Sequence, residues 1–332
     1  MTRELGVALV AIAVLAATAA PFEAPHSPDA HFPGLLNAPP TVVHLSGLDG
    51  RWHAPFIHRW RLVNQLEQRY EEDRTTSVPL SWFSGGRLVR SSNDEAVPLL
   101  LLGADSYGRD VFTRLIFGAR TSLALAVLAA FGAMLIGVAM GGVAGFAGGA
   151  LDDILMRSTD FVMVLPTIYV ALALRSVLPL VLTAGEVFAL LAAIFAVVGA
   201  PFVARGVRAI VRTERRLEYA AAAVALGASD ARLLIRHLLP ASRGFIVVQM
   251  TLLVPAFIIA EATLSYVGLG FPDPVASWGT MLHDASNNTR VFADFPWLLS
   301  PAAAMFLVVL GINLALQNSE RKDLPYERKI TP

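Results

Sequence analysis

The sequence contains no cysteine among its 332 residues. This absence excludes disulfide bonds, thiolate metal sites and a cysteine nucleophile. The histidines form no H-E-x-x-H pattern, and the chain has neither a P-loop nor a G-x-S-x-G motif. We therefore expect no catalytic residue, no metal site and no cofactor bound by the chain itself, and we expect that it is not an enzyme.

Charged residues are also scarce. They make up 16% of the chain, and hydrophobic residues make up 55%, whereas a soluble domain carries about 25% charge. Long apolar runs account for the deficit, and such runs are typical of membrane spans. The formal net charge is +0, so no overall field favours nucleic acid as a partner.

Six apolar runs predict an all-α polytopic membrane protein with six transmembrane helices. A Gly-Ala-Pro sequence at 199–201 is expected to kink the end of the fourth helix. The first run fits a cleaved signal peptide, because Ala17-Thr18-Ala19-Ala20 resembles a cleavage site, or a retained span. The runs cover 5–20, 121–146, 161–182, 187–203, 245–269 and 298–316.

The segment between the first and second runs differs from the rest in being rich in proline, tryptophan, histidine and mixed charge. We expect a small folded loop domain there. Its basic and aromatic stretch at 51–74 could contact nucleic acid, but four acids neutralise it, so we expect no nucleic acid partner. These acids are Glu67, Glu71, Glu72 and Asp73. The predicted division is a first transmembrane helix at 1–20, an extracytoplasmic loop region at 21–101, a five-helix core at 102–318 containing a cytoplasmic loop at 205–243, and a tail at 319–332.

Arginine and lysine in the short loops predict the orientation. The loop at 205–243 is rich in arginine and the tail after the sixth run contains both residue types, whereas the loop between the fifth and sixth runs holds only Arg290. Positively charged short loops stay in the cytoplasm. Both termini are therefore expected in the cytoplasm and the 21–101 region outside.

The cytoplasmic loop contains the sequence EYAAAAVALGASDARLLIRHLLP at 218–240. It predicts an alanine-rich helix over 218–226, ended by a left-handed Gly227. Ser229 or Asp230 would cap a second helix that runs to about Leu239, with Pro240 as a boundary. A smooth alanine ridge can dock into a groove of a partner protein. The alternative is a helix pair lying on lipid headgroups, since arginines recur near helical spacing from Arg205 onward.

This loop resembles the EAA loop of bacterial ABC importer permeases, with Ala222-Ala223, Gly227 and then His237-Leu238-Leu239-Pro240 in the expected order. Further motifs resemble the dipeptide, oligopeptide and nickel permease group: LGADSYGRDVFTRLIFGARTSL at 102–123, GFAGGALDDILMRSTD at 145–160, AEATLSYVGLGFPDP at 260–274 and SWGTML at 277–282. The resemblance runs from about Leu102 to Leu316 and is closest to the second permease type of the pair.

The resemblance implies a type I ABC importer permease fold in the cell inner membrane, with the first run retained as a span. It also implies a transmembrane subunit that forms a path for peptides or a related small solute. The implied partners are a second homologous permease, two ABC ATPases that bind ATP and magnesium, an extracytoplasmic solute-binding protein and the lipid bilayer. The identity of the solute stays open.

By this resemblance, the residues expected to couple the chain to the ATPases are Glu218, Tyr219, Ala221, Ala222, Ala223, Leu226, Gly227, Ala228, His237 and Pro240. The sequence departs from the family at Ala221, where a glutamate is usual, which puts the contact of that carboxylate with the ATPase in doubt. The 21–101 region is a second departure, because it has no counterpart that aligns to common members.

A second set of polar residues precedes or begins the second run, and it would serve either as an outer gate or as a buried ion-pair cluster. This set is Asp105, Gly108, Arg109, Asp110, Arg114 and Arg120. Asp160 and Glu261 are acids at or inside predicted spans, where acids are functional candidates. We interpret Glu261 as a carboxyl that bonds within the helix bundle, and we place Asp160 at the cytoplasmic membrane edge near Arg157.

Two other functions compete with this interpretation. A secondary transporter or channel subunit without an ATPase would be favoured by paired inverted repeats with broken helices, which we do not find in the sequence. An intramembrane enzyme would need the catalytic motifs that the sequence lacks.

Overall fold

The computed structural model describes residues 2–46, 52–166, 169–170, 173 and 182–316. The chain divides into two compact units, Met1–Ser122 with Ser265–Pro332, and Leu123–Leu264. Helix α2 (Val111–Ala147) contributes residues to both. Each unit is described by itself.

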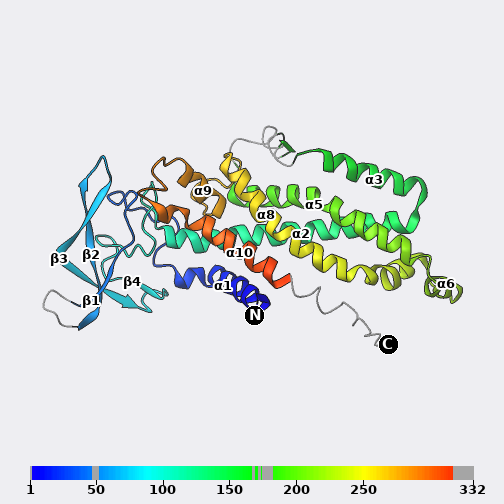
Figure 1. Ribbon diagram of the computed structural model, residues 1–332, viewed down its shortest axis with the longest axis horizontal. Helices are drawn as coiled ribbons and strands as arrows, with labels where there is room; N and C mark the ends of the chain where they lie inside the picture. Colours follow the sequence, from blue (N-terminus) through cyan, green and yellow to red (C-terminus); the bar gives the residue numbers. More distant parts are fainter. Residues whose placement is uncertain (1, 47–51, 167–168, 171–172, 174–181, 317–332) are drawn as a thin grey trace, which may run out of the picture. The chain divides into compact units, whose positions relative to one another are not determined.

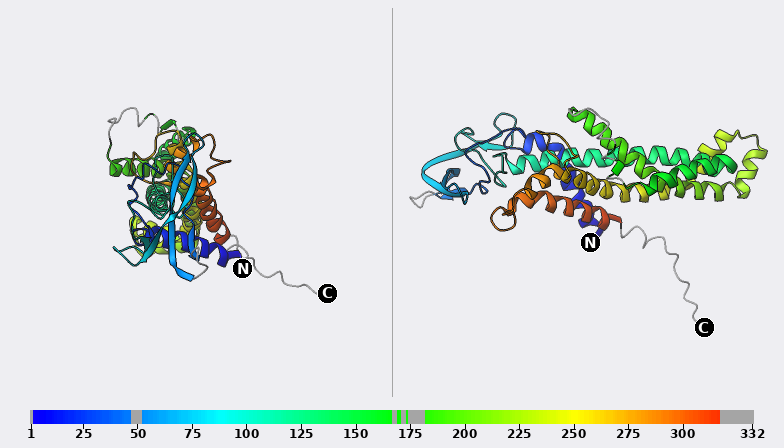
Figure 2. Two further views of the ribbon diagram at one scale, coloured as in Figure 1. Left: turned by 90° about the vertical axis from the view of Figure 1, so that its left-hand side faces the viewer. Right: turned by 90° about the horizontal axis from the view of Figure 1, so that it is seen from above.

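The first unit contains an antiparallel helix pair formed by the two ends of the chain. Helix α1 (Thr2–Glu23) lies beside α10 (Ser300–Leu316), as both figures of the whole chain show (Figures 1 and 2). The backbones approach closely at Gly6, where an added Cβ would lie 2.6 Å from the carbonyl oxygen of Gly311. Small residues allow such contacts between helices in lipid.

The loop domain expected after α1 is a four-stranded antiparallel sheet with strand order β1-β2-β3-β4 (Figure 1). The strands are β1 (Val43–Ser46), β2 (Trp52–Asn64), β3 (Arg69–Trp82) and β4 (Val89–Ser91). The expectation of an all-α chain is therefore wrong for this segment. Alternation in β2 places Ile57 in the sheet core and its neighbours Phe56 and His58 on the opposite face. The core of the sheet consists of Ile57, Val78, Val89, Val97 and Leu99.

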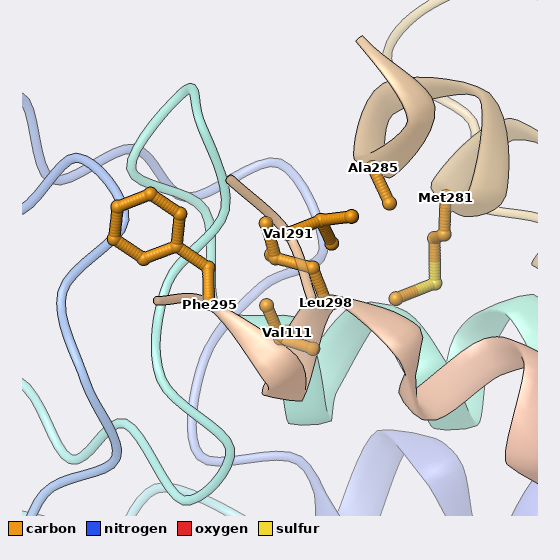
Figure 3. Close-up of a cluster of buried hydrophobic side chains, with 6 residues drawn as sticks. All are labelled: Val111, Met281, Ala285, Val291, Phe295 and Leu298. Carbon is orange, nitrogen blue, oxygen red and sulfur yellow. The ribbon is translucent and has the colours of Figure 1, made fainter. Parts of the chain in front are cut away.

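A second apolar cluster joins the start of α2 to the segment before α10. Helix α9 (Trp278–Ser286) and the short helix η3 (Pro296–Leu299) contribute to it. The buried residues of this cluster, drawn in Figure 3, are Val111, Met281, Ala285, Val291, Phe295 and Leu298. This cluster fixes α9 against the first turn of α2.

The second unit is built on α2 and α5 (Ala184–Glu214), with α3 (Gly149–Val164) and α8 (Arg243–Tyr266). Close approach between α2 and α5 occurs at Gly137 and Gly141, where an added Cβ would lie 2.4 Å from Val203 Cβ and 2.3 Å from the Ala204 carbonyl oxygen. Helix α8 packs on α5 as well, where the rings of Phe195 and Phe257 stack at 5.3 Å between centroids.

Five helical segments of the described residues are long and apolar enough to cross a membrane. The remaining predicted span, 161–182, lies mostly outside the described residues; α3 ends at Val164, and Leu165 takes an extended conformation before Pro166. The five segments are Thr2–Glu23, Val111–Ala147, Ala184–Glu214, Asp230–Tyr266 and Pro296–Leu316.

Two predicted helix ends differ from the structure. Helix α5 continues from Pro201 to Glu214 instead of ending near Val203, because a transmembrane helix tolerates an internal proline and the following alanine and arginine residues favour helix. Helix α2 begins at Val111 rather than near Thr121, since its first turns carry polar residues that hydropathy alone does not assign to a span.

Candidate functional site

The alanine-rich segment forms helix α6 (Glu218–Ala225) at one end of the second unit (Figure 1). Its C-terminus is a Schellman motif, in which Gly227 N–H donates to Val224 O at 2.9 Å and Ala228 N–H donates to Ala223 O at 3.0 Å. Gly227 has φ 84°, the left-handed conformation expected from the sequence. The motif ends α6 with a sharp reversal of the chain.

The alanine ridge of α6 faces outward. Ala221, Ala222 and Ala225 are exposed, and Leu226 is 89% exposed, whereas Ala220 is buried against the unit. The Leu226 side chain therefore protrudes at the end of the helix, beside a flat surface formed by the alanines. The docking of this face to a partner stays a prediction.

The helix after Gly227 begins as expected and ends differently. Ser229 caps α7 (Asp230–Arg232) by accepting a hydrogen bond from Arg232 N–H. The chain then passes through a π-helix, η1 (Leu233–Leu238), and a 3₁₀-helix, η2 (Leu239–Ser242), directly into α8. Pro240 is therefore a change of helix type, not an end, because the wider π turn accommodates the missing N–H of proline. His237 and Pro240 are half-buried in this connection.

Arginines of α5 pair with acids of α3. Arg208 donates from Nη2 to buried Asp152 at 2.5 Å, and Arg205 pairs with Asp160. Arg157 lies one turn before Asp160 on α3, and Asp160 forms its ion pair with Arg205 of α5. These ion pairs hold α3 to α5. At Arg205 and Arg208, the regularly spaced arginines that suggested contact with lipid headgroups therefore bind acids of α3. The hydrogen bonds from Arg208 also lower the pKa of Asp152.

A second polar site surrounds Arg109, just before α2. Its guanidinium donates to Asp105 Oδ2 at 2.6 Å, Asp273 Oδ1 at 3.0 Å and Asp284 Oδ2 at 2.6 Å, while only 3% of its side chain is exposed. Tyr107 places its ring 4.5 Å from the guanidinium carbon. Burial opposes the charge, but Asp105 and Asp284 more than offset it and raise the pKa of Arg109. Burial also raises the pKa of Asp284 against the opposing effect of Arg109.

The other residues predicted with Arg109 take different positions. Arg114 is buried and donates to Pro274 O at 3.1 Å. Gly108 has φ 76° and lies against Phe32, since an added Cβ would be 2.4 Å from Phe32 O. Asp110 accepts from Phe112 N–H at the start of α2. Arg120 is exposed on α2 and joins none of the hydrogen bonds described for this cluster.

Several residues of this cluster carried no role in the sequence analysis. Asp273 and Trp278 lie in the recognised motifs GFPDP and SWGTML, but nothing in the sequence showed that they meet the segment before and within α2. Trp278 donates from its indole to Leu115 O at 3.1 Å and from its backbone to Ser122 Oγ at 3.1 Å. The motifs at 102–123, 260–274 and 277–282 thus contact one another in the structure. The sequence shows their order along the chain but contains no sign of these contacts.

His26 forms a third polar contact that the sequence analysis missed. Its Nδ1 lies 3.0 Å from Asp110 Oδ2, and its Nε2 lies 3.5 Å from Asp94 Oδ1. Burial lowers its pKa, but both carboxylates together raise it above the usual value. Buried His26 therefore links the segment after α1 to the segment that follows β4 and to the residue directly before α2. Among intramembrane acids, Glu261 is 1% exposed within α8, and its bonding role stays a prediction.

Comparison with known proteins identifies the family of the chain. Residues 133–321 match the model of the binding-protein-dependent transport system inner membrane component. The chain is 41% identical over 213 residues to the oligopeptide transport system permease protein OppC of Bacillus subtilis, covering 64% of this chain and 67% of that protein. It is 43% identical to the dipeptide permease DppC of the same species, covering 64% of each chain. The glutathione transport system permease protein GsiD of Pectobacterium atrosepticum is 35% identical, covering 64% of this chain and 68% of GsiD.

Proposed function

The chain belongs to the family of inner membrane components of binding-protein-dependent transport systems, and from this premise we propose that it forms a peptide path with a second, related permease above two ATPases. It is a multi-pass protein of the inner membrane and a transmembrane subunit of an ABC importer. Peptides are the proposed solute because similar permeases are named for oligopeptide and dipeptide transport.

The exposed alanine ridge of α6 is the observation that carries the coupling part of this proposal. A helix of eight residues does not hold its shape alone in water, but Ala220 packs against the unit and the Schellman motif fixes the far end. The outward face is thereby rigid while remaining uncovered. We assign this face to the groove of an ATPase, with Ala221 and Ala222 at its centre.

Movement of the ATPases would reach the spans through a continuous helical path. Beyond the reversal at Gly227, helical structure runs without interruption from Asp230 to Tyr266. A displacement of α6 therefore acts on α8 through η1 and η2. We place the compliant point of this path at the π-helix η1, since π turns within α-helices recur at functional sites. ATP binding would close the two ATPases and tilt the spans between outward and inward states.

The orientation of the subunit follows from its charged loops. The loop at 205–243, which carries α6, is rich in arginine. Short loops with many basic residues stay in the cytoplasm. We propose that both termini and α6 face the cytoplasm, that α1 is a retained span and that the sheet and the Arg109 cluster face outward. A solute-binding protein would deliver peptide on that outer side.

The proposal is tested by purifying the chain after co-expression with its neighbouring permease, ATPases and binding protein. We expect a four-subunit membrane complex that accumulates labelled peptide in proteoliposomes only when ATP and loaded binding protein are present. Transport by the chain without any ATPase would instead support a secondary transporter.

A further inference from the structure

The turn between β3 and β4 is attached to the last turn of α1. Leu88 N–H donates to Phe22 O at 2.7 Å, and Arg87 Nη1 donates to Ala24 O at 3.0 Å. The rings of Phe22 and Phe83 lie 6.3 Å apart between centroids. Figure 1 shows this turn near the end of α1 from which the chain continues into the sheet domain. The turn and the helix end therefore lie at one level.

That level is set by the length of α1. This helix is a candidate membrane span of 22 residues, which at 1.5 Å per residue extends over about 33 Å. The hydrocarbon core of a bilayer is about 30 Å thick. When α1 crosses the membrane, Phe22 and Ala24 must lie at the bilayer surface, and the bonded turn must lie there too.

The turn exposes aromatic side chains at this level. Phe83 is 70% exposed, Trp82 is 54% exposed and Phe22 is 43% exposed. Phe83 also has φ 52°, a conformation that is uncommon for a bulky residue. Gly85 and Gly86 follow with positive φ and close the turn. The chain thus holds two adjacent aromatic rings outward in a conformation that packing within the sheet does not explain.

We propose that Trp82 and Phe83, together with Phe22, insert into the headgroup region of the bilayer and anchor the sheet to the membrane. Aromatic side chains concentrate at the membrane–water interface because their rings are apolar and tolerate partial hydration. The surface is continuous with the end of a membrane span, because Leu88 and Arg87 bond to the carbonyl oxygens of Phe22 and Ala24. The partner of this turn is therefore lipid, not a further protein.

The other end of the sheet is bonded to a loop of the same unit. At the turn between β2 and β3, Arg290 donates to Leu66 O at 3.3 Å and to Glu67 O at 2.6 Å. Arg290 lies in the loop between α9 and η3. The sheet consequently links the bilayer surface to the loop that precedes the last span.

Because this chain contains no cysteine, a single introduced cysteine is its only labelling site, and the complex is assembled with partner subunits whose cysteines have been replaced. The experiment places a nitroxide at Ser84→Cys in the turn, at Leu66→Cys in the β2–β3 turn, and at Ile12→Cys in the middle of α1. Ser84 is exposed, as are Leu66 at 91% and Ile12 at 64%. Each variant is incorporated into the complete complex in liposomes, and relaxation by oxygen is compared with relaxation by a water-soluble nickel chelate.

We expect the ratio of oxygen to nickel relaxation to be high at Ile12, low at Leu66 and intermediate at Ser84. Adding Phe83→Asp should lower the ratio at Ser84 toward that at Leu66 and leave Leu66 unchanged. A Ser84 label that matches Leu66 from the start would overturn the proposal by placing the turn in water. A label shielded from both reagents would also overturn it, by showing a protein partner. A high ratio at Ile12 in either case shows that α1 spans the membrane and that only the anchor has failed.

Discussion

Arg109 donates from Nη2 to Asp284 Oδ2 at 2.6 Å, and this bond joins the segment before α2 to helix α9 from the far end of the sequence. The same guanidinium holds Asp105 and Asp273. One buried cation thus fixes three segments of the first unit.

Replacing Arg109 by alanine should destabilise this unit and impair transport without releasing the ATPases. The change leaves buried carboxylates without their cation, and breaking a buried pair costs about 3–5 kcal/mol. Thermal unfolding of the purified complex, peptide uptake and ATPase content measure the three effects. Arg120→Ala is the matched control, because Arg120 is exposed, and it should change none of them. Loss of the ATPases in Arg109→Ala would show that the cluster holds the assembly together.

The buried position of His26 predicts a pH dependence of stability. Asp110 and Asp94 raise its folded-state pKa despite burial, so protonation stabilises the folded chain. This contribution is complete below the unfolded value near 6.5 and is lost as pH rises through the raised pKa. As the pH rises from mildly acidic to alkaline, the midpoint of thermal unfolding of the wild type should therefore fall relative to the midpoint of His26→Gln. A constant difference across that range would show that His26 stays in one protonation state.

The seam between α2 and α5 should tolerate no added methyl group at Gly141. A Cβ there would lie 2.3 Å from Ala204 O, so the helices must separate, and overpacking costs about 1–3 kcal/mol. Gly244→Ala is the matched control in α8, because nothing lies within 4 Å of its added Cβ. We expect Gly141→Ala to lower the unfolding midpoint and Gly244→Ala to leave it unchanged or raise it. Equal midpoints would contradict the close approach.

Reporter fusions test the orientation. A reporter fused at Asn64 should lie outside and one fused after Lys322 should lie inside, since the basic loops are expected in the cytoplasm. Both reporters on one side of the membrane would exclude the six-span arrangement.

The sequence predicted where α6 ends and where the next helix begins. The order of alanines, Gly227 and Ser229 predicted the end of α6 and the cap of the next helix, because both depend on near neighbours. The continuation through Pro240 was not predictable in the same way. Its path depends on a π turn that the surrounding helices support, and that support comes from tertiary packing.

The arginine cluster and the sheet show where the sequence was insufficient. Arg109 was recognised as a candidate, but its bonds to Asp273 and Asp284 depend on how distant segments pack. In the sheet, Trp52, Phe56 and Trp60 alternate with other residues as a strand requires, yet charges and histidines on both faces obscured the pattern. Pairing of β2 with β3 decides the structure there, and the turn at 65–68 contains none of the glycine-bearing pairs that signal a hairpin in a sequence.

Coupling through α6 is tested by ATP hydrolysis of the reconstituted four-subunit complex, measured with and without loaded binding protein. Gly227→Val should abolish the stimulation, because φ 84° strains a β-branched residue by about 1–3 kcal/mol although no atom obstructs its Cβ. Ala222→Trp should do the same by preventing the exposed ridge from docking, whereas Ala221→Glu, which restores the residue usual in the family, should keep it. If Gly227→Val and Ala222→Trp both retain full stimulation while all subunits stay assembled, α6 is not the coupling element.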